Sequence, residues 1–226
     1  MTLPLVSRHG ARGDLGSLRT TVRQALELVA LLCLPAAAGL AVLGVPVIGL
    51  IYEHGRFGAA DTSAAAQALA GYALGLAGYA GIKVLAPTFY ALGDARTPMA
   101  VSVLSIVTNY VLNWLLVRRL GFGHLGLALA TSAVALGNFG LLYVILRRRI
   151  GGLGVARTTG RIVAATAVMA AVAWVLDAAL LPSLPARAVL RYALRLGAVI
   201  PISVGVFWVA CRALGVAVPR LPLRRA

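Results

Sequence analysis

The chain has few of the residues that build soluble enzymes and metal sites. Its 226 residues include only six Asp and Glu, three His and two Cys, and Lys83 is its one lysine. Cys33 and Cys211 both lie in apolar stretches, where a thiol acts as a small hydrophobe, so we expect neither a disulfide framework nor a zinc site. No nucleophile, base and orienting acid recur at a workable spacing, so we predict no catalytic residues.

The shortage of acidic residues leaves a formal net charge of +15. The arginines lie mostly between apolar segments and are not interleaved with aromatic residues on a basic patch, so nucleic-acid binding is not expected. The first 24 residues are polar and basic and lack a central apolar core, which predicts no cleavable signal peptide.

Apolar residues are in large excess, at 61% of the chain, and no charged side chain occurs between Leu28 and Tyr52. An apolar run of about 18 residues or more can cross the bilayer as a helix, and such runs are far too long for barrel strands. We therefore predict an all-α polytopic membrane protein with helices at about 26–52, 62–92, 97–117, 122–146, 158–180 and 192–214. Residues 1–24 precede the first helix, residues 25–150 hold four helices, and residues 151–226 hold two more and a basic tail.

The distribution of basic residues predicts the orientation of these helices. With both termini in the cytoplasm, all but six of the 21 Lys and Arg residues lie on the cytoplasmic side, as the positive-inside rule favours. The six exceptions are Arg56, Arg118, Arg119, Arg187, Arg191 and Arg195. This orientation predicts a multi-pass membrane protein with both termini on the cytoplasmic side.

Several local signals predict helix ends and bends. Asp61-Thr62 is expected to cap the second helix, and Thr97-Pro98 the third, because proline at the first helical position loses no intrahelical bond. Prolines inside the helices remove a backbone donor and are expected to bend them. They are Pro35 and Pro46 in the first helix, Pro87 in the second and Pro201 in the sixth.

The second helix carries a line of small residues along one face, which lets another helix approach closely. Either this seam packs statically or it slides during a conformational cycle. Its members are Ala64, Ala68, Gly71, Gly75 and Gly78.

Three strings are more specific than hydropathy: GLIYEHGRFGAADT (49–62), ALAGYALGL (68–76) and KVLAPTFYALGDARTP (83–98). Together they resemble the MurJ/MviN family, the lipid II flippases of bacterial peptidoglycan synthesis. The resemblance continues through Asn109, Asn113 and residues 126–132, and becomes compositional in the last two helices.

The resemblance implies a fold and a function. Members of the family have fourteen membrane helices, and this chain looks like the last six, with residues 1–24 as the end of the preceding helix and its cytoplasmic loop. It implies part of a flippase that moves lipid II, the undecaprenyl-linked peptidoglycan precursor, to the outer leaflet by alternating access. The first lobe is missing, so we expect either a fragment or truncated product of such a protein, or a chain whose first lobe is supplied by a separate polypeptide. The alternatives are a polysaccharide or multidrug exporter of the same superfamily and a non-transporting membrane scaffold.

Charged residues in or beside the helices are the candidate substrate path. Lys83 interrupts an otherwise uncharged stretch, and a charge inside the membrane by default indicates function. It either reaches the interface by snorkelling or faces a cavity and a headgroup phosphate. Arg56 and Arg96 are the other candidates, with loop-tying ion pairs as their alternative role.

Polar residues in the third and fourth helices suggest a second site. Asn109 and Asn113 lie one turn apart, within expected reach of Thr131, as an interhelical hydrogen-bond cluster or as oxygen ligands of a coupling sodium ion. Asp177 is expected to pair with Arg187 or Arg191. The run Arg147 to Arg149 is expected to hold the topology and to attract anionic phospholipids.

Overall fold

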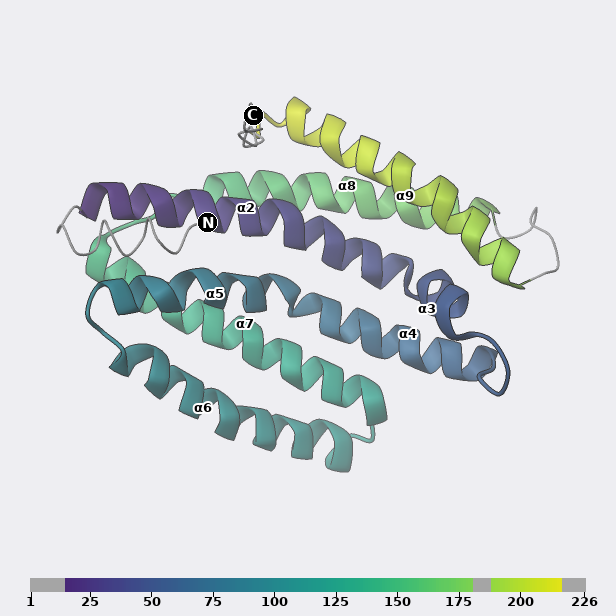
Figure 1. Cartoon of the computed structure of the whole chain (residues 1–226), viewed down its shortest axis with the longest axis horizontal. Helices are drawn as coiled ribbons and strands as arrows, with labels where there is room; N and C mark the ends of the chain where they lie inside the picture. Colours follow the sequence, from purple (N-terminus) through teal and green to yellow (C-terminus); the bar gives the residue numbers. More distant parts are fainter. Residues whose placement is uncertain (1–14, 181–187, 217–226) are drawn as a thin grey trace, which may run out of the picture.

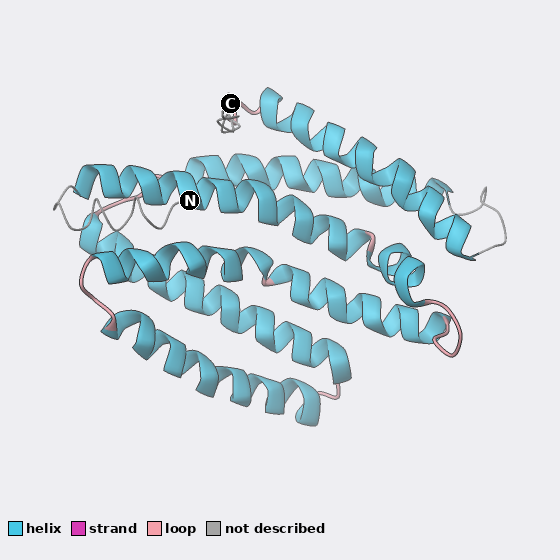
Figure 2. Cartoon of the chain, in the orientation of Figure 1, coloured by secondary structure: helices cyan, strands magenta, loops and turns pink. Residues whose placement is uncertain are grey.

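The computed structural model describes residues 15–180 and 188–216, and every regular element in these residues is helical (Figure 1, Figure 2). The chain folds as an antiparallel bundle of long helices, as a polytopic membrane protein requires. The elements are α2 (Leu15–Val42), α3 (Gly44–Tyr52), α4 (Ala59–Leu74), α5 (Leu76–Ala91), α6 (Arg96–Asn113), the π-helical turn η1 (Trp114–Arg119), α7 (Gly123–Ile150), α8 (Ala156–Leu180) and α9 (Ala188–Ala213).

Six helical segments in the described residues are long and apolar enough to cross a membrane, which confirms the predicted number. Two of the six differ from the prediction because they are interrupted. The first span is followed by the short helix α3, and the second is divided into α4 and α5.

The spans lie side by side in a regular order (Figure 1). The α4–α5 span packs between α2 and α7, while α6 covers the outer side of α7. On the other side of α2 lies α8, which packs against α9, and α9 also contacts α3. One end of the bundle carries the start of α2, the α5–α6 connection and the α7–α8 connection. We call this end the arginine-rich end.

The first helix begins at Leu15, so the prediction of a start near residue 26 was wrong. Arg19 and Arg23 resemble loop residues in the sequence, but arginine is a good helix former and its long side chain can reach the interface from a helix end. Residues 15–24 are therefore part of the first span and do not form a loop after a preceding helix. Residues 1–14 lie outside the described residues.

The first span ends at a bend at Leu43, three residues before Pro46. A proline lacks the N–H that would bind the carbonyl four residues earlier, and its ring clashes with that carbonyl, here that of Val42. Regular bonds flank the bend, from Leu43 N–H to Gly39 O at 2.8 Å and from Val47 N–H to Leu43 O at 3.0 Å. Pro35 lies inside α2, which continues past it.

The second span is interrupted at Gly75 and not at Pro87, which lies within α5. The Gly75 N–H turns to Tyr72 O, three residues back, at 3.0 Å. The Ser132 hydroxyl on α7 instead donates to Gly71 O at 2.6 Å, the carbonyl that a regular helix would pair with Gly75. A side chain inserted into the helical ladder is an established cause of such breaks.

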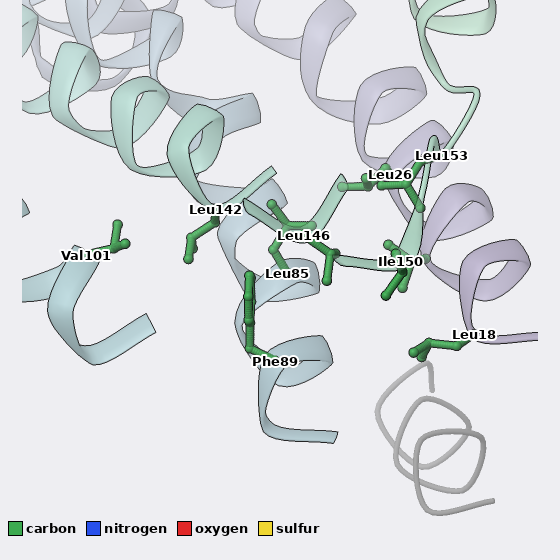
Figure 3. Packing of buried hydrophobic residues seen from close by; sticks show 10 residues of the cluster. Leu18, Leu26, Leu85, Phe89, Val101, Leu142, Leu146, Ile150 and Leu153 are labelled. Carbon is green, nitrogen blue, oxygen red and sulfur yellow. The ribbon is translucent and has the colours of Figure 1, made fainter. Parts of the chain in front are cut away.

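The largest apolar cluster fills the arginine-rich end of the bundle (Figure 3). Phe89 and Leu85 of α5 are fully buried against α7, and Leu18 of α2 belongs to the same cluster. Leu153 of the α7–α8 connection closes this cluster, so the loop that follows α7 is held against α2. Two smaller clusters join α8 and α9 to α2 and α3.

Candidate functional site

The line of small residues on the second span lies directly against α7. A Cβ atom built at Gly71 would lie 2.8 Å from Ala128 Cβ, and one at Gly78 would lie 2.9 Å from the Ala135 carbonyl carbon and oxygen. Gly75 faces Ser132 in the same way. The seam runs on towards Gly81 and does not extend to Ala64 or Ala68, which line an open pocket beside His124. From Gly71 to Gly78 the backbones of the two spans therefore approach closely over about two helical turns.

A different face of the same span is left uncovered. Tyr79, Lys83 and Tyr90 are exposed on α5, and Tyr72 is exposed on α4. At 100° per residue the three α5 positions fall within an arc of about 40°, so they form one stripe. Within the described residues, no hydrogen bond involves these phenol hydroxyls. We call Tyr72, Tyr79, Lys83 and Tyr90 the tyrosine–lysine face.

The tyrosine–lysine face is the best candidate for a functional surface in the described residues. Lys83 lies eight residues before the end of α5, or about 12 Å along the helix. A charged lysine at that depth is costly when it faces lipid. Tyrosine side chains are amphipathic, so they suit a surface that contacts water better than wholly apolar side chains do. The face can therefore line a polar path. Sequence reasoning singled out Lys83 and missed the tyrosines, although their spacing of seven and eleven residues is visible in the sequence.

The other two candidate path residues do not join Lys83. Arg56 lies exposed in the α3–α4 connection, while Arg96 lies exposed at the start of α6, at the arginine-rich end. The 33-residue span between these ends corresponds to about 50 Å of helix. The structure thus places these three cations at separate levels and does not gather them into one pocket.

Asn109 and Asn113 face each other on α6. The Asn113 amide donates to Asn109 Oδ1 at 2.9 Å, and Asn113 Oδ1 is buried without a partner among the described residues. The Thr131 hydroxyl donates to Leu127 O at 2.9 Å, and in the described part of the chain no hydrogen bond joins Thr131 to either amide. No group of three His, Cys, Asp or Glu in these residues could hold a metal ion.

Glu53 connects three helices, α3, α4 and α9, at the end of the bundle opposite the arginine-rich end. Its Oε2 accepts hydrogen bonds from Thr62 at 2.8 Å and from Tyr192 of α9 at 2.9 Å. The second span begins at Ala59, so the predicted cap at Asp61-Thr62 was wrong in position. Asp61 lies in the first turn and accepts a hydrogen bond from the Gly58 N–H at 3.0 Å, while the Thr62 hydroxyl donates to Glu53.

Asp94 organises the connection at the arginine-rich end. It accepts the Thr97 hydroxyl at 2.6 Å and the Thr97 N–H at 3.0 Å, and it pairs with Arg149. These hydrogen bonds from Thr97, followed by the charge of Arg149, hold the pKa of Asp94 below its ordinary value of 3.8. The third helix begins at Arg96, one residue before the predicted cap, and the capping acceptor is Asp94.

Among the described residues, Asp177 pairs with Arg195 and not with the predicted Arg191. Asp177 Oδ1 accepts from Arg195 Nε at 2.9 Å, and Arg195 is only 4% exposed. Arg191 instead lies over the ring of Tyr192, and Arg187 lies outside the described residues. This buried pair joins α8 to α9. Removal of one partner of such a pair strongly destabilises the folded protein.

The six helical spans and their close backbone packing define a multi-pass α-helical membrane protein. The family model described as lipid II flippase MurJ matches residues 1–210. The chain belongs to this family, which separates it from the exporters of the wider superfamily.

Two relatives show how much of such a protein the chain represents. It is 37% identical over 175 residues to a probable lipid II flippase MurJ of Synechocystis sp., covering 76% of this chain and 32% of that protein. It is 39% identical over 141 residues to a probable lipid II flippase MurJ of Rickettsia prowazekii, covering 62% of this chain and 27% of that protein. The chain thus spans about a third of the length of these relatives.

A solved structure of lipid II flippase MurJ in an inward closed conformation has the same fold. The TM-score is 0.72 at 21% sequence identity, and the match covers 94% of this chain and 43% of the other. The helical arrangement described above is therefore that of one part of a larger bundle.

Proposed function

We propose that this chain forms the carboxyl-terminal portion of a lipid II flippase that works by alternating access. The observation that carries the proposal is the uncovered tyrosine–lysine face on a membrane span of a chain that belongs to the MurJ family. Moving a lipid across a bilayer breaks no bond, so it needs a shielded polar path for the headgroup rather than catalytic residues. A partner lobe opposite this face would close such a path.

In this proposal the partners are lipid II, anionic phospholipids and a separate amino-terminal lobe. The protein lies in the bacterial inner membrane with both termini in the cytoplasm, so that the arginine-rich end is cytoplasmic. The positive-inside rule supports this orientation. Arg119 is one of the six basic residues that this orientation places on the opposite side. It lies 5.1 Å from the centre of the Trp114 ring, an aromatic contact typical of a membrane interface.

A sodium ion is proposed as the coupling ion, with Asn109, Asn113 and Thr131 contributing side-chain oxygens. The unpartnered Asn113 Oδ1 supports this role. These three oxygens are only part of a site, because hard cations take about six oxygen ligands. The remaining ligands would come from residues outside this chain. Sodium-dependent thermal protection of the assembled protein, absent in Asn113→Ala, is the expected result.

Complementation of a flippase-depleted strain tests the proposed function. We expect rescue when the chain is co-expressed with an amino-terminal lobe and no rescue by the chain alone. Rescue by the chain alone would show that the amino-terminal lobe is not needed. A lack of rescue in both cases, with both parts present in the membrane, would contradict the flippase proposal and favour the scaffold.

A pair of single substitutions tests the role of the tyrosine–lysine face in the same strain. Lys83→Ala is expected to remove most of the complementing activity, because Lys83 is the only charged residue between Thr62 and Gly93 on this span. Arg148→Ala is the matched control, since it also removes one exposed positive charge but from a run of three arginines. Equal activity of the two variants at matched expression would contradict a role for Lys83 in the path.

A further inference from the structure

A pocket at the arginine-rich end lies between the start of α2 and the loop that follows α7. Its volume is about 290 Å³, near the lower limit for small-molecule sites. Unlike the apolar pocket between α6 and α7, it is lined mainly by polar groups. The lining side chains are Arg19, Thr20, Arg23 and Leu153, and the rest is the backbone of Gly16, Gly152 and Gly154.

The loop backbone is shaped around the two guanidinium groups. Gly151 and Gly154 have φ angles of 86° and 65°, which favour glycine. A Cβ at Gly151 would lie 3.4 Å from the Arg19 Cζ, and one at Gly154 would lie 3.6 Å from an Arg23 nitrogen. Burial of Leu153, which is 3% exposed, anchors the loop in this position. The pocket is therefore a built feature rather than a chance gap between mobile side chains.

Both guanidinium groups retain donors for a ligand. Arg19 donates one N–H to Gly152 O, and Arg23 donates Nε–H to Glu27 at 3.0 Å. Each guanidinium carries five N–H donors, so most have no partner among the described residues. Glu27 offsets part of the charge, and the pocket keeps a positive balance. Guanidinium groups in pairs favour phosphate oxygens, which they bind in a bidentate manner.

The position of the pocket distinguishes a lipid from a free anion. The pocket lies at the first turns of α2, a helix that is long and apolar enough to cross a membrane. In a bilayer this end of the helix lies near the headgroups, where the phosphates of phospholipids are concentrated.

We propose that this pocket binds the phosphodiester headgroup of an anionic membrane phospholipid. Arg19 and Arg23 bind the phosphate oxygens, the loop of residues 151–154 (the glycine loop) shapes the pocket, and the acyl chains remain in the surrounding bilayer. The site specifies the phospholipid partner of the proposed function. Its test uses binding to the purified chain, so its failure and a failure of complementation are separate results.

The test is titration of the purified, detergent-solubilised chain with phosphatidylglycerol and with phosphatidylcholine, read by native mass spectrometry. The chain is expected to bind phosphatidylglycerol at least tenfold more tightly, because the choline cation of phosphatidylcholine neutralises its phosphate and competes with the arginines for it. Equal affinity for the two lipids would overturn the proposal. Displacement of phosphatidylglycerol by millimolar inorganic phosphate would also overturn it, because the pocket would then bind phosphate without needing the rest of the lipid.

Substitutions separate the pocket from general attraction to a basic surface. Arg19→Gln with Arg23→Gln is expected to weaken phosphatidylglycerol binding at least tenfold more than Arg147→Gln with Arg148→Gln, which removes the same charge at the same end. Equal weakening by the two pairs would show diffuse attraction only and overturn the proposal.

A lysine pair guards against a folding defect in the glutamine pair. Arg19→Lys with Arg23→Lys keeps both charges but loses the guanidinium fork. Binding several-fold weaker than in the unsubstituted chain is expected, and unchanged binding would overturn the bidentate contact.

Discussion

Gly78 is the position where a single methyl group should most clearly perturb the bundle. In Gly78→Ala the new Cβ would lie 2.9 Å from the Ala135 carbonyl carbon and oxygen and 3.0 Å from the Leu136 nitrogen. All three are backbone atoms of α7, so no side chain can rotate away to make room. The two spans must separate by at least about 0.6 Å, since carbon pairs prefer about 3.5–4.0 Å.

The expected cost follows from that separation. Such a gap forfeits roughly a quarter to a half of the dispersion energy of each contact across the seam, and overpacking of this kind typically costs about 1–3 kcal/mol. Alanine also favours the helix over glycine by about 1 kcal/mol, which offsets part of the cost. Gly140→Ala on α7 gains the same propensity without a clash, because nothing lies within 4 Å of its Cβ.

The comparison of these two variants isolates the clash. We expect Gly78→Ala to have a free energy of unfolding about 2 kcal/mol below that of Gly140→Ala, measured by SDS titration in mixed micelles and monitored by circular dichroism. Both proteins should retain the same helical content before the titration. Equal free energies would refute the conclusion that the seam is held by touching backbones.

Three further substitutions test contacts between helices and at a loop. Ser132→Ala leaves Gly71 O without its partner and should lower the free energy of unfolding by about 1 kcal/mol in the same SDS titration. An unchanged free energy would show that Ser132 does not stabilise the helix break at Gly75. Asp94→Asn should flatten the acid limb of a stability-against-pH curve: the lowered pKa of Asp94 stabilises the fold above 3.8, and that contribution is lost as the pH falls through the folded-state pKa. An unchanged acid limb, followed by near-ultraviolet circular dichroism, would contradict this. Asp177→Asn should cost about 3 kcal/mol because it leaves Arg195 buried and unpaired, whereas Asp177→Leu with Arg195→Met should cost less; equal losses would argue against coupling.

The sequence predicted the number and type of the helices because the bilayer imposes long apolar segments, and hydropathy records those segments directly. It misplaced the start of the first helix, because the sequence does not show whether Arg19 and Arg23 lie in a loop or at a helix end. It also assigned the bend of the second span to Pro87. The actual break at Gly75 depends on Ser132, which is far away in the chain and reaches the helix only in the folded bundle.

The candidate site was predicted less completely for a similar reason. Lys83 is conspicuous as the single lysine, but its neighbours on the tyrosine–lysine face are identified only when the covered faces of α4 and α5 are known. The ion partner of Asp177 depends on the register of α8 against α9. A shift of about one helical turn decides between Arg191 and Arg195, and no local signal fixes that register.

The double contact of Glu53 has a mechanical consequence. One carboxylate holds the first turn of α4 and the first turns of α9 at the same end of the bundle, while Asp177 and Arg195 clamp α9 to α8 nearby. If the four-helix part tilts during a transport cycle, the last two helices are pulled along from this end. Any relative motion between them must then be concentrated at the far end, where α2 and the glycine loop meet.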